Sequence, residues 1–76
     1  MEVKVRLNGL LAASAGFKEK ALELPEGTTI LEVMGLIALP VRSAWIRSSV
    51  NGKLRDKVHV LQDGDELLLF PVGGGG

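Results

Sequence analysis

Hydrophobic and polar residues alternate with a period of two at the start of the chain. Val3, Val5 and Leu7 alternate with charged residues, which predicts a β-strand with one buried and one hydrated face over residues 1–8. Residues 18–24 alternate in the same way and predict a second strand, antiparallel to the first and nearer to an edge. The small apolar residues between the two strands predict a loop or a short helical turn.

A helix is predicted after the second strand. Thr29 and Glu32 have the spacing of a capping box, in which each side chain bonds the backbone N–H of the other residue. The apolar residues that follow recur at helical spacing: Ile30, Val33, Met34 and Ile37. Pro40 is expected to stop the helix. A helix this short is unstable alone, so we expect it to lie on the apolar face of the sheet, with Met34 in the core.

The second half of the chain reads as three further strands. Residues 43–50 alternate, with Ala44, Ile46, Ser48 and Val50 on one face. Asn51-Gly52 predicts a type I′ hairpin turn, because both central positions need positive φ. A short strand is expected within residues 53–60, and a turn at 62–65.

The last strand, residues 66–70, is apolar on both faces. Leu67 and Leu69 point one way, and Leu68 and Phe70 point the other. Such a strand is either central in the sheet or exposes one face to a partner. The whole order predicts an α+β fold: a mixed sheet of four or five strands with one main helix packed on one face. Parallel pairing of the first and last strands at the centre would make this a β-grasp.

Four glycines close the sequence, and we expect them to form a tail over residues 72–76 behind a domain of residues 1–71. Glycine has no side chain to pack and loses the most conformational freedom when it is ordered. The tail is therefore either a frayed end or a thin, flexible thread that carries a terminal carboxylate.

Composition narrows the function classes. A domain of 76 residues buries only roughly 60% of its unfolded surface, which leaves little room to enclose a substrate. The absence of cysteine excludes disulfides, thiolate metal sites and cysteine nucleophiles. Nine basic residues balance nine acidic ones, so no net field attracts nucleic acid or an anionic membrane. Without a signal-peptide pattern or a membrane-length apolar run, we expect a cytoplasmic protein.

A few single residues were weighed as sites. His59 has no cluster of metal ligands in the sequence around it, so a surface or turn role is expected and no metal site. Trp45 is either an interface anchor or a cover for the core edge, and the second interpretation is preferred. Residues 63–65 have a turn signature. A small basic cluster forms either a solvated loop or a contact with an acidic partner surface: Lys53, Arg55 and Lys57.

The chain resembles the ubiquitin-like sulfur carriers MoaD (molybdopterin synthase small subunit) and ThiS (thiamine biosynthesis) over nearly its whole length. The resemblance rests on these segments: Val3-Lys4-Val5-Arg6-Leu7 with Gly9-Leu10-Leu11, Leu24-Pro25-Glu26-Gly27-Thr28-Thr29-Ile30, Val50-Asn51-Gly52, Leu61-Gln62-Asp63-Gly64-Asp65-Glu66 and Phe70-Pro71. The loop at 9–17 is longer than in ThiS, which favours MoaD. MoaD tails commonly read Phe-Pro-Pro-Val-x-Gly-Gly, whereas here Val72 comes one place earlier and Gly73 and Gly74 replace larger residues.

This resemblance implies a carrier without a catalytic site or bound cofactor of its own. An E1-like enzyme of the MoeB/ThiF type would use ATP to adenylate the Gly76 carboxylate, which then becomes a thiocarboxylate. The large synthase subunit, of the MoaE type, would accept the tail and pass its sulfur to the molybdopterin precursor. In this scheme the residues that thread through the partner are Gly73, Gly74 and Gly75. The partner-binding residues would be Leu68, Phe70 and Pro71.

Several alternatives remain open at this point. The carrier could serve thiamine or another sulfur-containing product. Gly76 could instead form an isopeptide bond with lysine, which would make the chain a protein modifier. A plain β-grasp binding module with an idle tail is the third alternative. Leu68 and Phe70 could also belong to a second core layer rather than to an interface.

Overall fold

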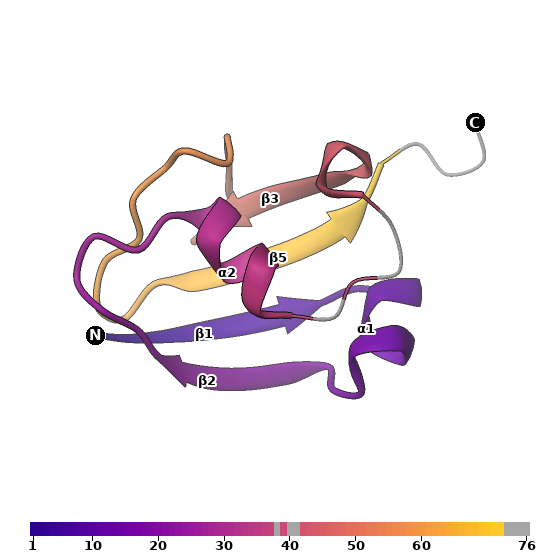
Figure 1. Cartoon of the computed structure of the whole chain (residues 1–76), viewed down its shortest axis with the longest axis horizontal. Coiled ribbons are helices and arrows are strands. Elements are labelled where there is room, and N and C mark those ends of the chain that lie inside the picture. The colour runs from indigo at the N-terminus through magenta and orange to yellow at the C-terminus, as the bar shows by residue number, and fades with distance from the viewer. Residues whose placement is uncertain (38, 40–41, 73–76) are drawn as a thin grey trace.

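A computed structural model describes residues 1–37, 39 and 42–72. Its elements are β1 (Glu2–Leu7), α1 (Leu10–Ala15), β2 (Glu19–Glu23), α2 (Ile30–Leu36), the 3₁₀ turn η1 (Ser43–Trp45), β3 (Ile46–Val50), β4 (Lys53–Arg55) and β5 (Glu66–Pro71). The strands form one sheet in the order β2-β1-β5-β3-β4 (Figure 1). β1 and β5 pair in parallel at the centre, and the other pairs are antiparallel. The predicted β-grasp is therefore confirmed, with β2 at one edge.

The core lies between the sheet and the helices. In β1, residues alternate between exposed and buried, and Val3, Val5 and Leu7 point inward as predicted. Leu67 and Leu69 of β5 lie beside Val5 and Leu7 in the parallel register. Because the two central strands bury their apolar side chains on the same face, that face and α2 enclose one continuous core.

The segment between β1 and β2 is a short helix rather than a loop. Gly9 begins it at φ 52°, and Gly16 ends it at φ 86°, where its N–H donates to the Ala12 carbonyl oxygen (N···O 3.0 Å). Both values lie in the left-handed region that glycine adopts without strain. Leu11 is the buried residue of α1, so this helix closes one end of the core.

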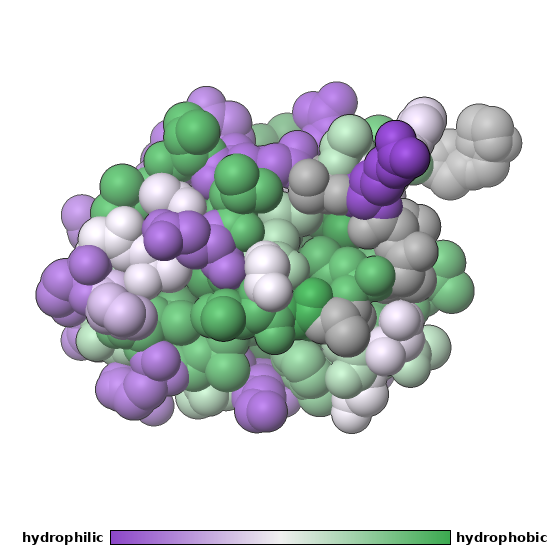
Figure 2. Space-filling view, viewed as in Figure 1, coloured by the Kyte–Doolittle hydropathy of each residue, from purple (hydrophilic) through white to green (hydrophobic). Residues whose placement is uncertain are grey.

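The capping box at the start of α2 is present. The Glu32 N–H donates to Thr29 Oγ1 (3.3 Å), and the Thr29 N–H donates to Glu32 Oε1 (2.9 Å). The predicted inward residues of α2 are buried: Ile30, Val33 and Met34. The exposed surface around α2 mixes hydrophobic and hydrophilic residues (Figure 2), so this helix is not enclosed on its outer side.

α2 ends earlier than the sequence predicts. Ile37 was expected on the helix, but it has extended backbone (φ −109°, ψ 136°) and is only half-buried. Gly35 and β-branched Ile37 are poor helix formers, which weakens the last turn. Pro40, the expected stop, lies outside the described residues. Among the described residues, no helix is long and apolar enough to cross a membrane.

β3 begins later than predicted. Residues 43–45 form the 3₁₀ turn η1, and Ala44 is exposed rather than on the core face. The ladder between β3 and β5 starts at the pair Ile46–Pro71, so residues before Ile46 have no paired strand residue to hold them extended. Asn51 and Gly52 adopt φ 53° and 87°, which confirms the predicted turn and places Val50 opposite Lys53.

Candidate functional site

The two faces of β5 have different environments. Leu67 and Leu69 are fully buried on the α2 side. Leu68 and Phe70 are half-buried on the opposite face, and Pro71 is exposed. Figure 1 shows α2 on one face of the sheet, and no described helix covers the other. Leu68 and Phe70 therefore do not belong to a closed second core layer.

A third apolar residue joins them on the outer face of the sheet. Leu68 lies between Arg6 of β1 and Ser49 of β3 in the strand register. Ser49 in turn faces Leu54 of β4, whose exposed fraction is 66%. We call the three residues Leu54, Leu68 and Phe70 the outer patch. Apolar side chains that are partly exposed and gathered on one face are a feature of protein interaction surfaces.

Leu54 was not singled out from the sequence, although a signal was present. The two-residue Asn51-Gly52 turn fixes Leu54 opposite Ser49 and therefore on the same face. What the sequence could not show is that β5 pairs with β3 on its other side. That adjacency is the reason why Leu54 and Leu68 share one surface.

Charged residues border the outer patch on the β1 side. Arg6 Nη1 lies 3.3 Å from Glu66 Oε1, and Arg6 Nε lies 3.4 Å from Glu19 Oε1. Lys4 Nζ lies 3.8 Å from Glu19 Oε2. These side chains are about half exposed, so each pair contributes little to stability. Their effect is to orient Arg6 beside Leu68, where both line a hollow of about 680 Å³.

The chain leaves the sheet from a fixed point. The Val72 N–H donates to the Trp45 carbonyl oxygen (N···O 2.9 Å), which holds the backbone in place one residue beyond the end of β5. Trp45 has an exposed fraction of 61%, so the interpretation of this residue as a cover for the core edge is wrong. Trp45 was expected on a strand, but it is the last residue of the 3₁₀ turn η1. The residues predicted to carry the chemistry, Gly73, Gly74, Gly75 and Gly76, lie outside the described residues.

The remaining candidates have structural contacts. His59 is half-buried, and its carbonyl oxygen accepts the Ile30 N–H at the start of α2 (3.1 Å). Asp63 Oδ1 accepts the Glu2 N–H (2.7 Å) in the predicted turn. Among the described residues, no three His, Cys, Asp or Glu side chains gather in a metal-binding group.

Comparison with known proteins identifies relatives of this fold. The model of the ThiS family matches residues 5–76. SAMP1 from Haloferax volcanii is 23% identical with a TM-score of 0.79, over 100% of both chains. A chain from the complex of subunits 1 and 2 of the molybdopterin-converting factor of Helicobacter pylori is 22% identical with a TM-score of 0.69, also over 100% of both. Urm1 from Trypanosoma brucei is 18% identical with a TM-score of 0.73, over 99% of this chain and 95% of its own. No curated protein sequence matches this chain.

Proposed function

The chain belongs to the ThiS family, and from this membership we propose that it is a sulfur carrier whose working group is the Gly76 carboxylate. The observation that supports this most directly is that the family match extends to residue 76 and so includes the glycine tail. A plain binding module would need no such tail. In this proposal the chain has no catalytic site of its own, and its partners supply ATP and catalysis.

The proposed chemistry has two balanced steps. A Gly76 carboxylate oxygen attacks the α-phosphorus of ATP on an E1-like enzyme, which forms an acyl-adenylate and releases pyrophosphate. Sulfide then attacks the carbonyl carbon, AMP leaves with the former carboxylate oxygen, and a thiocarboxylate and one proton result. Glycine suits this position because a Cβ would hinder approach to the carbonyl.

The body of the domain is proposed to aim the tail. β5 is paired with strands on both sides, and the backbone is held as far as Val72. Four residues follow, and a fully extended segment of that length reaches roughly 14 Å. This reach would carry the carboxylate into a partner active site while the domain stays outside. Residues 1–71 would then be the rigid part and residues 72–76 the part that enters the partner.

The outer patch and Pro71 are proposed to bind the partners. The patch is apolar, partly exposed and on the strand from which the tail leaves, so one surface can both dock the domain and orient the tail. We propose two partners: an E1-like activating enzyme and a synthase large subunit of the MoaE type. For the second, the support is the complex of subunits 1 and 2 in which the Helicobacter pylori relative was solved. The sulfur would then be used in molybdopterin biosynthesis.

Two other uses of the same carboxylate remain candidates. The likeness to SAMP1, a protein named as a modifier in a related structure, and to Urm1 favours conjugation of Gly76 to a lysine amine as the second candidate. The family name itself points to thiamine or another sulfur-containing product. The molybdopterin carrier, the protein modifier and the carrier for thiamine or another product would all begin with adenylation of Gly76. They would differ in what next receives the activated group: sulfide and then a sulfur acceptor, or a lysine amine.

Intact-mass measurement separates these candidates. The chain is incubated with a cognate activating enzyme, ATP and sulfide. A mass gain equal to one sulfur replacing one oxygen supports the carrier, whereas a ladder of heavier conjugates supports the modifier. If the mass stays unchanged with several activating enzymes, the carrier proposal is wrong and the binding module is preferred.

The matched control is deletion of Gly76 alone. We expect this variant to fold normally and to gain no sulfur. Sulfur loading of the deletion variant would show that Gly76 itself is not required. Addition of the large synthase subunit and the pterin precursor then tests the final destination of the sulfur.

A further inference from the structure

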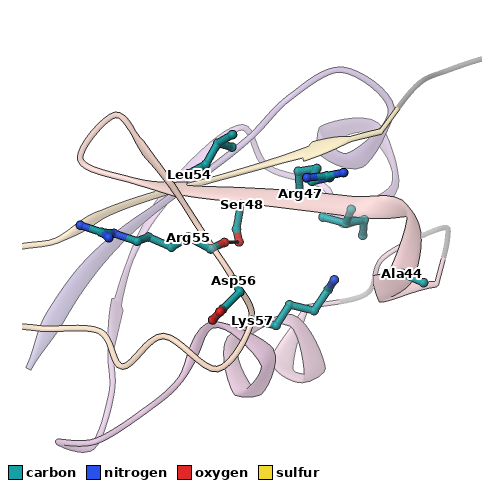
Figure 3. Close-up of a pocket in the computed structure, with 8 residues that line it drawn as sticks. Ala44, Arg47, Ser48, Leu54, Arg55, Asp56 and Lys57 are labelled. Atoms are coloured by element: carbon teal, nitrogen blue, oxygen red, sulfur yellow. Dashed lines mark hydrogen bonds between the residues drawn. The ribbon is translucent and has the colours of Figure 1, made fainter.

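An open strand edge lies on the far side of β3 from β5. β4 pairs only with Ser48, Ser49 and Val50, so within the described part of the chain Ile46 and Arg47 have no strand beside them on that edge. A hollow of about 400 Å³ takes the place of the missing strand. It is lined by Ala44, Ile46, Arg47, Ser48, Leu54, Arg55, Asp56 and Lys57 (Figure 3).

The backbone at this edge is directed into the hollow. In an antiparallel sheet, successive residues of a strand turn their N–H and C=O groups to opposite sides. The Asn51 N–H donates to Glu66 of the neighbouring chain segment on the β5 side (2.9 Å), and the Trp45 carbonyl oxygen accepts the Val72 N–H on that same side. The N–H and C=O of Ile46 therefore point the other way, where a further strand would pair.

The charge at this edge is strongly positive, although the whole chain is neutral. The charged residues that line the hollow are Arg47, Arg55 and Lys57 with the single acid Asp56, a net charge of +2. Among ion pairs between described residues, all involve the Met1 amine, Lys4 or Arg6, and none involves Arg47, Arg55 or Lys57. Asp56, the single acid, accepts the Val58 N–H at Oδ1 (3.2 Å).

One cation, the ammonium group of Lys57, faces the hollow. In Figure 3 the ammonium group of Lys57 reaches toward β3, and the Asp56 carboxylate points away from it. Arg47 extends from the opposite face of β3, the face that it shares with Phe70 in the strand register, and Leu54 and Ile46 add apolar surface. The hollow thus combines an unpaired stretch of strand edge with the Lys57 cation and apolar side chains.

We propose that this edge binds an acidic, extended segment of a partner protein, which pairs with the Ile46 backbone and places a carboxylate beside the Lys57 ammonium group. Arginine and lysine side chains form strong charge-assisted bonds with carboxylates, and strand addition supplies main-chain bonds. A second copy of this chain fits poorly, because two such edges would bring like charges together. The hollow lies at the edge of the sheet and meets the outer patch at Leu54, but the inference does not depend on sulfur transfer.

The hollow lies close to the point where the C-terminal tail leaves the sheet. η1 forms one end of the hollow through Ala44, and its next residue, Trp45, holds Val72 at the exit of the chain. A partner that engages residues beyond Val72 therefore has this edge within easy reach. Binding through such exposed charges weakens as salt increases, because the charges are screened.

The test uses the isotope-labelled full chain and a synthetic peptide of alternating glutamate and valine. In NMR titrations we expect amide shifts centred on Ile46, Arg47 and Lys57, and slower hydrogen exchange at the Ile46 amide. Two control peptides keep the length: one has lysine in place of glutamate, and one has proline at the central pairing position. Both are expected to bind about tenfold more weakly or not at all.

Matched variants give the decisive comparison. Lys57→Glu should weaken binding of the acidic peptide about tenfold, and Lys57→Gln serves the same purpose if the first variant does not fold. Lys18→Glu changes the net charge equally beside β2, at the opposite edge of the sheet, and should leave the affinity within about twofold. Equal losses in both variants, or shifts that avoid Ile46, would overturn the proposal. Concentration-dependent shifts of these amides without peptide would assign the edge to self-association instead.

Discussion

Single side chains stabilise two places where the chain changes direction: the start of α2 and the turn between β3 and β4. Thr29 and Glu32 close the start of α2 with reciprocal bonds. Asn51 has a positive φ and also binds β5, since its Nδ2 donates to Asp65 Oδ1 (3.0 Å) and its Oδ1 accepts the Glu66 N–H (2.9 Å). Thr29 and Asn51 each make their bonds at an exposed site, so the contribution of each side chain to the free energy of unfolding can be measured by a single substitution.

Thr29→Ala should lower the free energy of unfolding by about 1 kcal/mol, because the Glu32 N–H loses its side-chain acceptor. Thr29→Ser keeps the hydroxyl group and should restore most of that stability. Urea denaturation followed by circular dichroism measures both. Equal stability of the alanine variant and the original chain would show that the cap is not needed here.

Asn51→Ala should lower the free energy of unfolding by about 2 kcal/mol, because it removes two hydrogen bonds and places alanine at a positive φ that asparagine tolerates better. Asn51→Gly retains the turn and removes only the bonds, so its loss should be smaller. The same denaturation assay compares them. If glycine and alanine cost the same, the backbone conformation contributes nothing measurable.

At the scale of elements, β5 is the strand that joins stability to recognition. It is the central strand, with β1 on one side and β3 on the other. Its inward leucines belong to the core, and its outward residues, Leu68 and Phe70, lie on the outer patch. Because side chains alternate along β5, neighbouring residues have different roles: one set stabilises the core, and the other is exposed for binding.

Paired truncations test this separation. Leu67→Ala should cost about 3 kcal/mol of unfolding free energy, because it leaves a cavity in a fully buried site. Leu68→Ala should cost about 1 kcal/mol, since part of the side chain already faces water. The partner-binding proposal adds that Leu68→Ala weakens association with the activating enzyme, as measured by titration calorimetry. Unchanged affinity for this variant and for Phe70→Ala would place the interface elsewhere.

At the scale of the whole molecule, the proposed carrier divides into a body that folds and a tail that reacts. Deletion of residues 73–76 should change the free energy of unfolding by less than about 0.5 kcal/mol, because glycines without side chains add no apolar burial. The same deletion should abolish sulfur loading in the mass assay. A large loss of stability would show that the tail packs against the body, and the division into two parts would be wrong.

The surface of the candidate site was only partly predictable. Leu68 and Phe70 were found because alternation in one strand shows its two faces. Leu54 and the open edge at Ile46 were not found, because they depend on which strands become neighbours and on where β4 stops pairing. Trp45 was misplaced for the same reason: an alternating pattern continues through residues 43–45, but no strand is present there to pair with.

Local signals in the sequence were sufficient for the elements, the two glycine-rich or capped junctions and the parallel centre of the sheet. These depend on side-chain periodicity and on the φ values that particular residues tolerate, which act over a few positions along the chain. The tertiary structure alone decided the starting point of β3, the 3₁₀ turn at Trp45 and the positively charged edge. Each of these results from pairing between residues far apart in the sequence, where the hydrogen bonds available from a neighbouring strand outweigh local propensity.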